Sequence, residues 1–232
     1  LIPPIFTPFY STGFMGVDLF FALSGFVIAH RYLGHLPTWV SVKEFLSLRL
    51  ARIWPVHFLV MVVVGSAFLL FGTVPISGPR AVIDVQSGLT NVFMIHAWFN
   101  QPLSWNLPAW TISLEWFAYL TFPAVAALVL AMQKRMKNLV VGTALVTLAY
   151  TPLFLQAFGI LHLGDFGVGF IGVSLIRILG GFYGGFGAFI LARELQTRYY
   201  IRQATRAAYI TLAVLICITV AIVLLIIAFG SD

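Results

Sequence analysis

Six apolar segments, each about 18 to 24 residues long and nearly free of charge, decide what this chain can fold into. A helix of about 20 apolar residues crosses the roughly 30 Å hydrocarbon core of a bilayer. Inside lipid, such a segment must satisfy its own backbone hydrogen bonds. The sequence therefore predicts an all-α, polytopic transmembrane helical bundle. The expected spans are residues 13–30, 54–72, 108–131, 139–156, 170–192 and 207–229.

The segments between the spans are too short for a soluble domain. The composition agrees, because 61% of the 232 residues are hydrophobic and only 9% are charged. We therefore expect one transmembrane domain over residues 1–232. The chain starts without Met or a secretory signal, so we expect it to be incomplete at both ends. The apolar stretch 91–99 is too short to span and predicts a half-membrane segment. KEFLSLRLARIWP, residues 43–55, predicts a short amphipathic helix before the second span.

The basic residues predict the orientation of the chain. Three loops on one side of the expected bundle hold 11 of the 13 Lys and Arg residues. The positive-inside rule makes that side cytoplasmic and puts residue 1 and the C-terminus of this chain outside. The net charge of +6 is explained by this topology, so the lipid bilayer is an expected partner and nucleic acid is not. We expect a multi-pass protein of the cell (inner) membrane.

Three charged residues interrupt the apolar spans: Asp18, Glu115 and Arg177. Counting residues from the outer border places all three about 8 to 11 Å deep. A charge within a bilayer costs about 2.5 to 3.5 kcal/mol on insertion scales, so we expect the three to face one another or a wet cavity. The alternative is an ion pair that only holds helices together.

Other polar and small residues follow helical spacing. Thr111, Glu115 and Tyr119 recur every four residues and form one polar stripe, which we expect to face the protein interior. After Arg177, small residues also recur every four positions, at Gly180, Gly184 and Ala188 and at Gly181 and Gly185. Such rows allow another helix to approach closely, which would bring Arg177 to its partners.

Arg49 and Arg52 lie three apart and emerge on one helix face on the expected cytoplasmic side. Two guanidinium groups so placed can bind phosphate oxygens in a bidentate manner. On physical grounds alone, positive-inside anchoring, which every multi-span protein needs, is the favoured explanation of the two arginines.

Three motifs resemble the acyltransferase family 3 membrane proteins. GVDLFFALSGFVI at 16–28 resembles that family's GVDLFFVLSGFLI, and Arg49, Arg52, Ile53 and Pro55 match its RxxRIxP pattern. WTISLEWFAYLTFP at 110–123 is similar to WSLxxExxFYLxxP, with Thr111 where Ser is usual, and RILGGFYGG fits a glycine-rich helix that starts with Arg.

The resemblance implies about ten spans and an O-acyltransferase that moves an acyl group, expected to be acetyl, from cytoplasmic acyl-CoA to a hydroxyl of an envelope glycan. Arg49 and Arg52 would then bind the CoA phosphates. Glu115 would orient a catalytic His or act on the acceptor, and Asp18 would share that role or be structural. Acyl-CoA is the donor substrate, and no bound cofactor is expected.

One departure from the family pattern concerns the start of the chain. The family's first helix carries an Arg and, about ten residues later, the His regarded as catalytic, and no such pair precedes residue 13. We expect the missing helix to lie upstream; a chain that truly began at Leu1 would be expected to be inactive.

His96 is the candidate to replace that base, because the short segment that carries it precedes the expected third span on the outer side. The alternative is an ordinary interfacial histidine. His57, at the expected cytoplasmic border, is treated as interfacial. Asn106 and Trp110 lie in the same outer region and could line the acceptor site.

Two other classes remain open at this stage. Asp18, Glu115 and Arg177 would also suit the substrate path of a multi-span carrier, and a non-catalytic scaffold is a third possibility. The arginine pair beside the WTISLE motif favours the enzyme. No set of His, Cys, Asp and Glu has metal-ligand spacing, and Cys217 is expected to pack in the last span.

Overall fold

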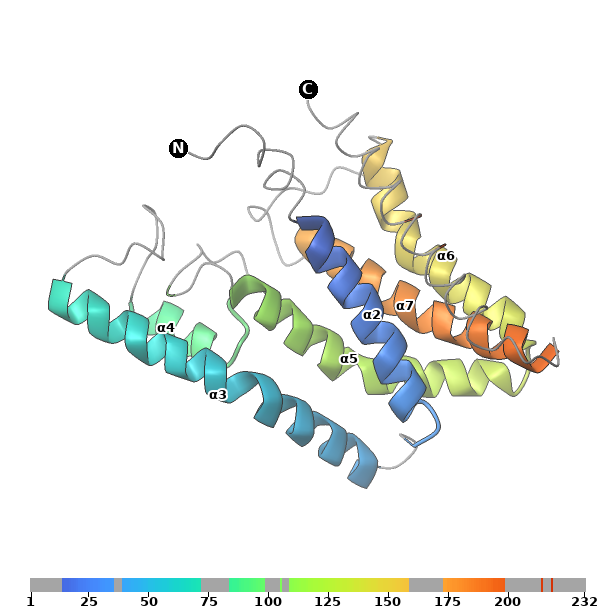
Figure 1. Ribbon diagram of the computed structural model, residues 1–232, viewed down its shortest axis with the longest axis horizontal. Helices are drawn as coiled ribbons and strands as arrows, with labels where there is room; N and C mark the ends of the chain where they lie inside the picture. The colour runs from blue at the N-terminus through green and yellow to red at the C-terminus, as the bar shows by residue number, and fades with distance from the viewer. Residues whose placement is uncertain are drawn as a thin grey trace. The chain divides into compact units, whose positions relative to one another are not determined.

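The computed structural model describes residues 14–35, 39–71, 84–98, 105, 109–158 and 173–198, together with 214 and 218. Its helices, in chain order, are α2 (Phe14–Tyr32), α3 (Trp39–Phe71), α4 (Val85–Val92), α5 (Trp110–Gln133), α6 (Asn138–Ala157) and α7 (Val173–Arg198) (Figure 1). No strand occurs among the residues described, so the predicted all-α class is confirmed.

Four helices of the described chain are long and apolar enough to cross a bilayer. Their spanning stretches are Ser41–Phe71, Trp110–Gln133, Asn138–Gln156 and Ser174–Thr197. They correspond to the second to fifth expected spans, and α2 corresponds to the first. The expected span 207–229 lies outside the described ranges apart from two single residues. The predicted polytopic membrane fold is confirmed, and large exposed side chains such as Leu69, at 85% exposure, suit contact with lipid.

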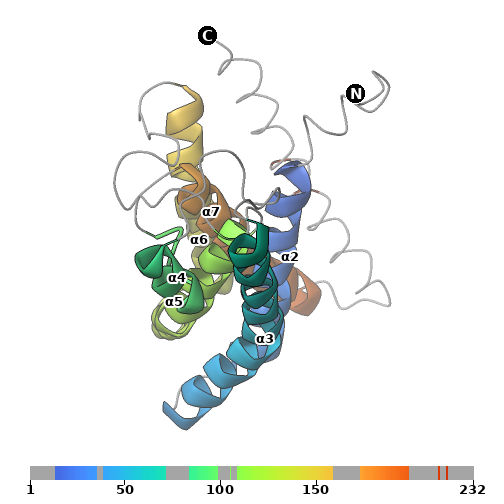
Figure 2. The same ribbon diagram turned by 90° about the vertical axis from the view of Figure 1, so that its left-hand side faces the viewer.

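Helix α3 corrects one prediction. The amphipathic segment 43–55 and the second span 54–72 were expected as separate helices, but α3 runs through both as one helix of 33 residues (Figure 2). At about 1.5 Å per residue it is about 50 Å long, well beyond the hydrocarbon thickness of roughly 30 Å. Pro55 lies inside it and removes one backbone hydrogen bond without ending the helix.

The half-membrane segment was also placed too late in the sequence. The short helix is α4, which starts at Val85 and ends at Val92, and the apolar residues 93–98 form turns rather than helix. Asp84 and Ser87 form a capping box that fixes the start of α4. The helix ends before Met94, whose φ of 55° is left-handed and incompatible with a continuing helix.

The chain divides into two compact units. The first contains α2, α6 and most of α7, and α7 uses its two small-residue rows against different neighbours. Gly181 and Gly185 face the α2 backbone at Asp18 and Ala22, whereas Gly180 and Gly184 face α6. The expectation that the glycines permit close helix packing is confirmed. The membrane-spanning part of α7 is 72% buried, more than in the other three long helices.

The second unit contains α3, α4 and α5 up to Val125. Phe45 of α3 packs on Tyr119 and Phe122 of α5, with ring centroids 6.2 and 5.5 Å apart. The indole N–H of Trp54 donates to the backbone carbonyl of Val92 over 3.1 Å, which fixes the end of α4 beside α3. These contacts hold two long helices and one short helix together.

Replacing Gly185 by Ala tests the packing of α2 on α7. A Cβ atom at Gly185 would overlap the carbonyl oxygen of Ala22, so the helices must separate, at a cost of about 1 to 3 kcal/mol. We expect a clearly lower thermal unfolding midpoint in detergent. Gly16→Ala is the matched control, because a Cβ at Gly16 meets no atom within 4 Å. Equal midpoints for the two variants would contradict the packing.

Candidate functional site

A carboxylate, a phenol and two guanidinium groups come together in the second unit. The hydroxyl of Tyr119 donates to Oε1 of Glu115, one helical turn earlier on α5. The guanidinium carbon of Arg49 lies 5.7 Å from the centroid of the Tyr119 ring and 5.6 Å from that of Phe45. Aromatic rings attract cations at this distance, so they fix where the Arg49 charge lies.

Arg52 completes this cluster. It follows Arg49 by three residues on α3, and the charges of both arginines reach the Glu115 carboxyl group. Arg52 is exposed, whereas Arg49 is partly buried and Tyr119 is buried. We call Arg49, Arg52, Glu115 and Tyr119 the arginine–carboxylate cluster. It can hold an anion on its exposed guanidinium beside an acid or base on α5.

This cluster corrects the expected depth of its members. The sequence interpretation placed Arg49 and Arg52 on the cytoplasmic side and Glu115 near the outer border, whereas Arg49 lies beside Tyr119, the hydrogen-bond partner of Glu115. Residue counting failed because it assumed that α5 starts at the far end of α3, whereas Tyr119, in the third turn of α5, already packs against Phe45 and Arg49 in the first half of α3.

Asp18 and Arg177 form an ion pair within the first unit. Nη2 of Arg177 lies 2.7 Å from Oδ2 of Asp18, and the Asp18 side chain is 7% exposed. The expectation that these two charges face each other is confirmed. The pair joins α2 to α7 at the level where the glycine row begins, as expected for an ion pair that holds helices together.

His57 and His96 lie against each other in the second unit, with ring centroids 5.8 Å apart and planes at 11°. Nε2 of His57 lies 2.9 Å from the carbonyl oxygen of Asn91, so it carries the proton that is donated there. The two histidines were expected at opposite borders of the membrane, which is wrong. The segment 84–98 lies along α3, where Trp54 and His57 bond to the backbone carbonyls of Val92 and Asn91.

His96 is buried and held in its neutral form. Burial lowers its pKa from the usual 6.5 to about 4, and the nearby His57 acts in the same direction. Neither ring nitrogen makes a hydrogen bond of ordinary geometry within the described ranges. Backbone groups of Ala109 and Thr90 come near and oppose the shift only in part.

Ser113 is a buried residue of this region that the sequence analysis did not single out. Its hydroxyl donates to the carbonyl of Met94 over 2.8 Å and accepts the backbone N–H of Ala97 over 3.1 Å. Its own carbonyl accepts the indole N–H of Trp98 over 2.9 Å. These bonds fasten turn 93–98 to α5. A small hydroxyl inside the apolar WTISLEW stretch was the available signal.

The candidates for the acceptor site, Trp110, Thr111 and Asn106, are described only in part. Trp110 and Thr111 form the partly buried first turn of α5, four residues or more before Glu115. Asn106 lies outside the described residues. Among the residues that are described, no group of three or more His, Cys, Asp or Glu could hold a metal ion.

Comparisons with known proteins agree with these motifs. A family model described as an acyltransferase domain, acyltransferase 3, matches residues 2–231. The acyltransferase MdmB of Streptomyces mycarofaciens is 30% identical over 115 residues, 48% of this chain and 28% of that protein. Protein 2 in the picA locus of Rhizobium radiobacter is 30% identical over 118 residues, 45% of this chain and 62% of that protein.

A third relative is SACOL0978, a proposed O-acetyltransferase of Staphylococcus aureus (strain COL). It is 29% identical over 138 residues, 54% of this chain and 22% of that protein. The matched regions therefore cover less than two thirds of these relatives. No solved structure matches the chain.

The His96 site predicts loss of stability in mild acid. Because the folded-state pKa of about 4 lies below the usual 6.5, the unfolded chain takes up a proton first as the pH falls. Stability from this group is fully present above about pH 6.5 and declines between about 6.5 and 4. We expect about 2 kcal/mol to be lost between about pH 7.5 and pH 5.

The measurement is the pH dependence of the thermal unfolding midpoint in detergent. His96→Phe should flatten this dependence, while His35→Phe, which replaces an exposed histidine, should leave it unchanged. An unaltered pH dependence in His96→Phe would show that His96 does not titrate as its burial requires.

Proposed function

The chain belongs to the acyltransferase 3 family of membrane proteins, and on this premise we propose that it forms part of an O-acyltransferase. The enzyme would move an acyl group from acyl-CoA on the cytoplasmic side to a hydroxyl of an envelope or exported carbohydrate. The observation that carries the proposal is the arginine–carboxylate cluster, which sets an anion-binding guanidinium beside a carboxylate.

In this reaction the acceptor oxygen attacks the thioester carbonyl, a C–O bond forms and the C–S bond breaks. The hydroxyl proton passes to a base, and the leaving CoA thiolate takes up a proton. A phosphate-binding site, a base and donors to the oxyanion are the groups that lower the barrier.

Arg52 and Arg49 are assigned to the CoA phosphates. Arg52 is exposed and can form charge-assisted, bidentate hydrogen bonds with phosphate oxygens. Arg49 is partly buried against Phe45 and Tyr119, so it contributes a fixed positive charge and orients the cluster. Their place beside Glu115 would bring the donor to the carboxylate directly, with no passage from one border of the bilayer to the other.

Glu115 is assigned to the acceptor, as a base or as the partner that orients a catalytic histidine. Tyr119 positions it by donating a hydrogen bond from the next turn. His96 remains a second base candidate, because its neutral imidazole has a lone pair and is buried near the start of α5. Thr111, Trp110 and Asn106 are assigned to acceptor contacts near that same start.

Asp18 and Arg177 are assigned a structural part in this proposal. Their ion pair lies in the packed contact between α2 and α7, where each charge stabilises the other. The pairing also weakens the alternative of a carrier, for which these two charges would need to face a substrate path.

The relatives suggest the acyl group and its acceptor. The name of the S. aureus relative specifies O-acetyl transfer, which supports an acetyl donor and a hydroxyl acceptor. We propose the inner cell membrane as the location, with residue 1 and the C-terminus of this chain on the extracytoplasmic side. The basic loop at 134–137 supports this orientation.

Arg52→Ala tests the donor site. The full-length protein in membranes should consume acetyl-CoA when given a glycan acceptor, and the variant should raise the KM for acetyl-CoA about tenfold or more. A lost charge-assisted hydrogen bond is worth about 1.5 to 3 kcal/mol, which supports this size of effect. Arg49→Ala combined with Arg52→Ala should raise the KM further.

Lys43→Ala is the matched control, since it removes an exposed cation from the same helix nine residues earlier. We expect it to leave the KM within about twofold, as is usual for exposed charges. Equal effects of Lys43→Ala and Arg52→Ala would leave only a general electrostatic contribution and would exclude a specific phosphate site.

Glu115→Gln tests the carboxylate. The amide keeps the shape of the side chain and loses its capacity to accept a proton, so we expect kcat to fall about 100-fold or more. The protein should still accumulate in membranes with an unchanged unfolding midpoint. Full activity in this variant, or loss of folded protein as its main effect, would remove Glu115 from the reaction.

A further inference from the structure

Phe45 is a buried aromatic residue of α3 that has no role of its own in the reaction described so far. Its side chain is 1% exposed and packs on α5 within the second unit. The guanidinium carbon of Arg49, one turn later on the same helix, lies 5.6 Å from the centroid of the Phe45 ring. A core phenylalanine therefore lies against a charged group of the arginine–carboxylate cluster.

Tyr119 supplies a second ring around the same charge. Its centroid lies 5.7 Å from the guanidinium carbon of Arg49. The Phe45 and Tyr119 rings meet edge to face, with centroids 6.2 Å apart and planes at 79°. An aromatic face attracts a cation within about 6 Å of the ring centroid. Two rings from two helices thus favour one position for this guanidinium group, and we call Phe45 and Tyr119 the aromatic pair.

The hydroxyl of Tyr119 links the aromatic pair to the carboxylate. It donates a hydrogen bond to Oε1 of Glu115, one turn earlier on α5. The ring of Tyr119 therefore attracts the cation assigned to the donor, while its hydroxyl holds the carboxylate assigned to the acceptor. Phe45 contacts this arrangement only on the side of the cation, so the two parts of the site can be perturbed separately.

Phe122 of α5 packs on the Phe45 ring as well. The two ring centroids lie 5.5 Å apart, and the Phe122 side chain is buried. Side chains in close-packed cores occupy well-defined rotamers, so the core fixes Phe45, and Phe45 in turn restricts Arg49. An arginine side chain with free rotamers loses conformational entropy when it binds an anion. Holding it in place before binding reduces that loss and raises the affinity.

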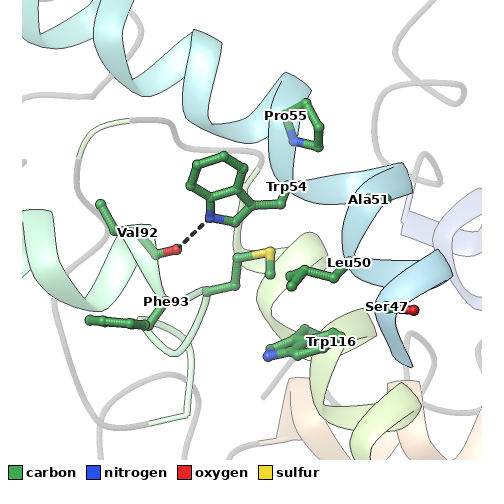
Figure 3. Close-up of a pocket in the computed structure, with 9 residues that line it drawn as sticks. Ser47, Leu50, Ala51, Trp54, Pro55, Val92, Phe93 and Trp116 are labelled. Carbon is green, nitrogen blue, oxygen red and sulfur yellow. Dashed lines mark hydrogen bonds between the residues drawn. The ribbon is translucent and has the colours of Figure 1, made fainter. Parts of the chain in front are cut away.

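The aromatic pair acts on the face of α3 that carries the arginines. Phe45, Arg49 and Arg52 follow one another at intervals of four and three residues and share one helix face. Leu50 and Trp54 lie on the opposite face, where they line an apolar hollow (Figure 3). The ring of Phe45 is thus placed to affect the anion-binding face.

We infer that Phe45 is a positioning residue of the donor site: together with Tyr119, it holds the Arg49 guanidinium where that group binds the CoA phosphates. The inference rests on the proposed acyl transfer and adds a residue to its donor site. Because Phe45 is buried, it acts through Arg49 and not by contact with the donor. Loss of its ring weakens donor binding, whereas kcat changes little because Tyr119 still holds Glu115.

Ring fluorination at position 45 tests the attraction between the ring and the cation. Each fluorine withdraws electron density from the ring face and weakens that attraction, while the shape of the side chain changes little. With one, two and three fluorines, we expect the dissociation constant of coenzyme A to rise stepwise, by about threefold to tenfold in all. Coenzyme A is the probe because it carries the phosphates and transfers no acyl group.

Fluorinated phenylalanine at position 21 is the matched control. Phe21 is equally buried, at 1% exposed, but it belongs to the first unit. The same replacements there should leave the dissociation constant within about twofold. A dissociation constant that does not depend on fluorination at position 45, or that depends on it equally at both positions, would overturn the role of Phe45.

A double-mutant cycle tests whether Phe45 acts through Arg49. Phe45→Leu keeps an apolar side chain and removes the ring, so we expect the KM for acetyl-CoA to rise about fivefold and kcat to stay within about twofold. In Arg49→Ala protein, the same change should raise the KM no further, because the cation that the ring positions is gone. Equal effects of Phe45→Leu in the two backgrounds would show that the ring acts by packing alone and would overturn the inference.

The binding measurement separates this inference from the proposed function. Coenzyme A binding that weakens stepwise with fluorination, in full-length protein that transfers no acyl group from acetyl-CoA, would support the positioning of Arg49 and reject the proposed function. Normal acyl transfer with binding that is insensitive to fluorination would support the proposed function and reject the role of Phe45. Failure of the wild-type protein to bind coenzyme A would overturn both.

Discussion

Charge within apolar surroundings is the constraint on which this structure depends. Each charged group among the lipid-facing helices requires a partner, because the bilayer offers no water to replace one. Asp18 on α2 forms an ion pair with Arg177 on α7. The glycine row after Arg177 lets the backbones of α2 and α7 come close enough for this pair to form. Glu115 accepts a hydrogen bond from Tyr119 on its own helix, and the charges of two arginines on α3 act on it. The positions of these charges thus fix which helix faces meet within each unit.

Residues 84–98 give the second unit its chemical character. This segment is too short to span, and buried hydrogen bonds hold it between α3 and α5. His57 donates to Asn91, Trp54 donates to Val92, and Ser113 binds both Met94 and Ala97. A segment fixed in this way leaves an apolar hollow beside it and buries His96, whose ring nitrogens make no ordinary hydrogen bond within the described part of the chain. Backbone outside a helix needs other hydrogen-bond partners, and these contacts supply several of them from the protein itself.

Periodicity predicted the helices better than it predicted their contacts. The four long apolar helices and α2 lie where hydropathy placed them, because a spanning segment is set by its own composition. The spacing of Glu115 and Tyr119 correctly predicted that they share a face. The continuity of the amphipathic segment with the second span was missed, because hydropathy distinguishes the two stretches although the helix passes through Pro55 without a break. The path of residues 84–98 was missed because its capping box and left-handed Met94 act locally and leave no hydropathy signal.

The sequence by itself determined a charge-poor helical membrane protein with the motifs of one acyltransferase family, because span length, apolar composition and motif order are properties of the chain alone. Tertiary structure decided which groups surround each polar side chain. It placed Arg49 beside Tyr119 and Glu115, brought His57 against His96, and left an apolar hollow between α3, the turn after α4 and α5. The physical reason is that these neighbours are distant in sequence and meet only when residues 84–98 and α5 pack against α3.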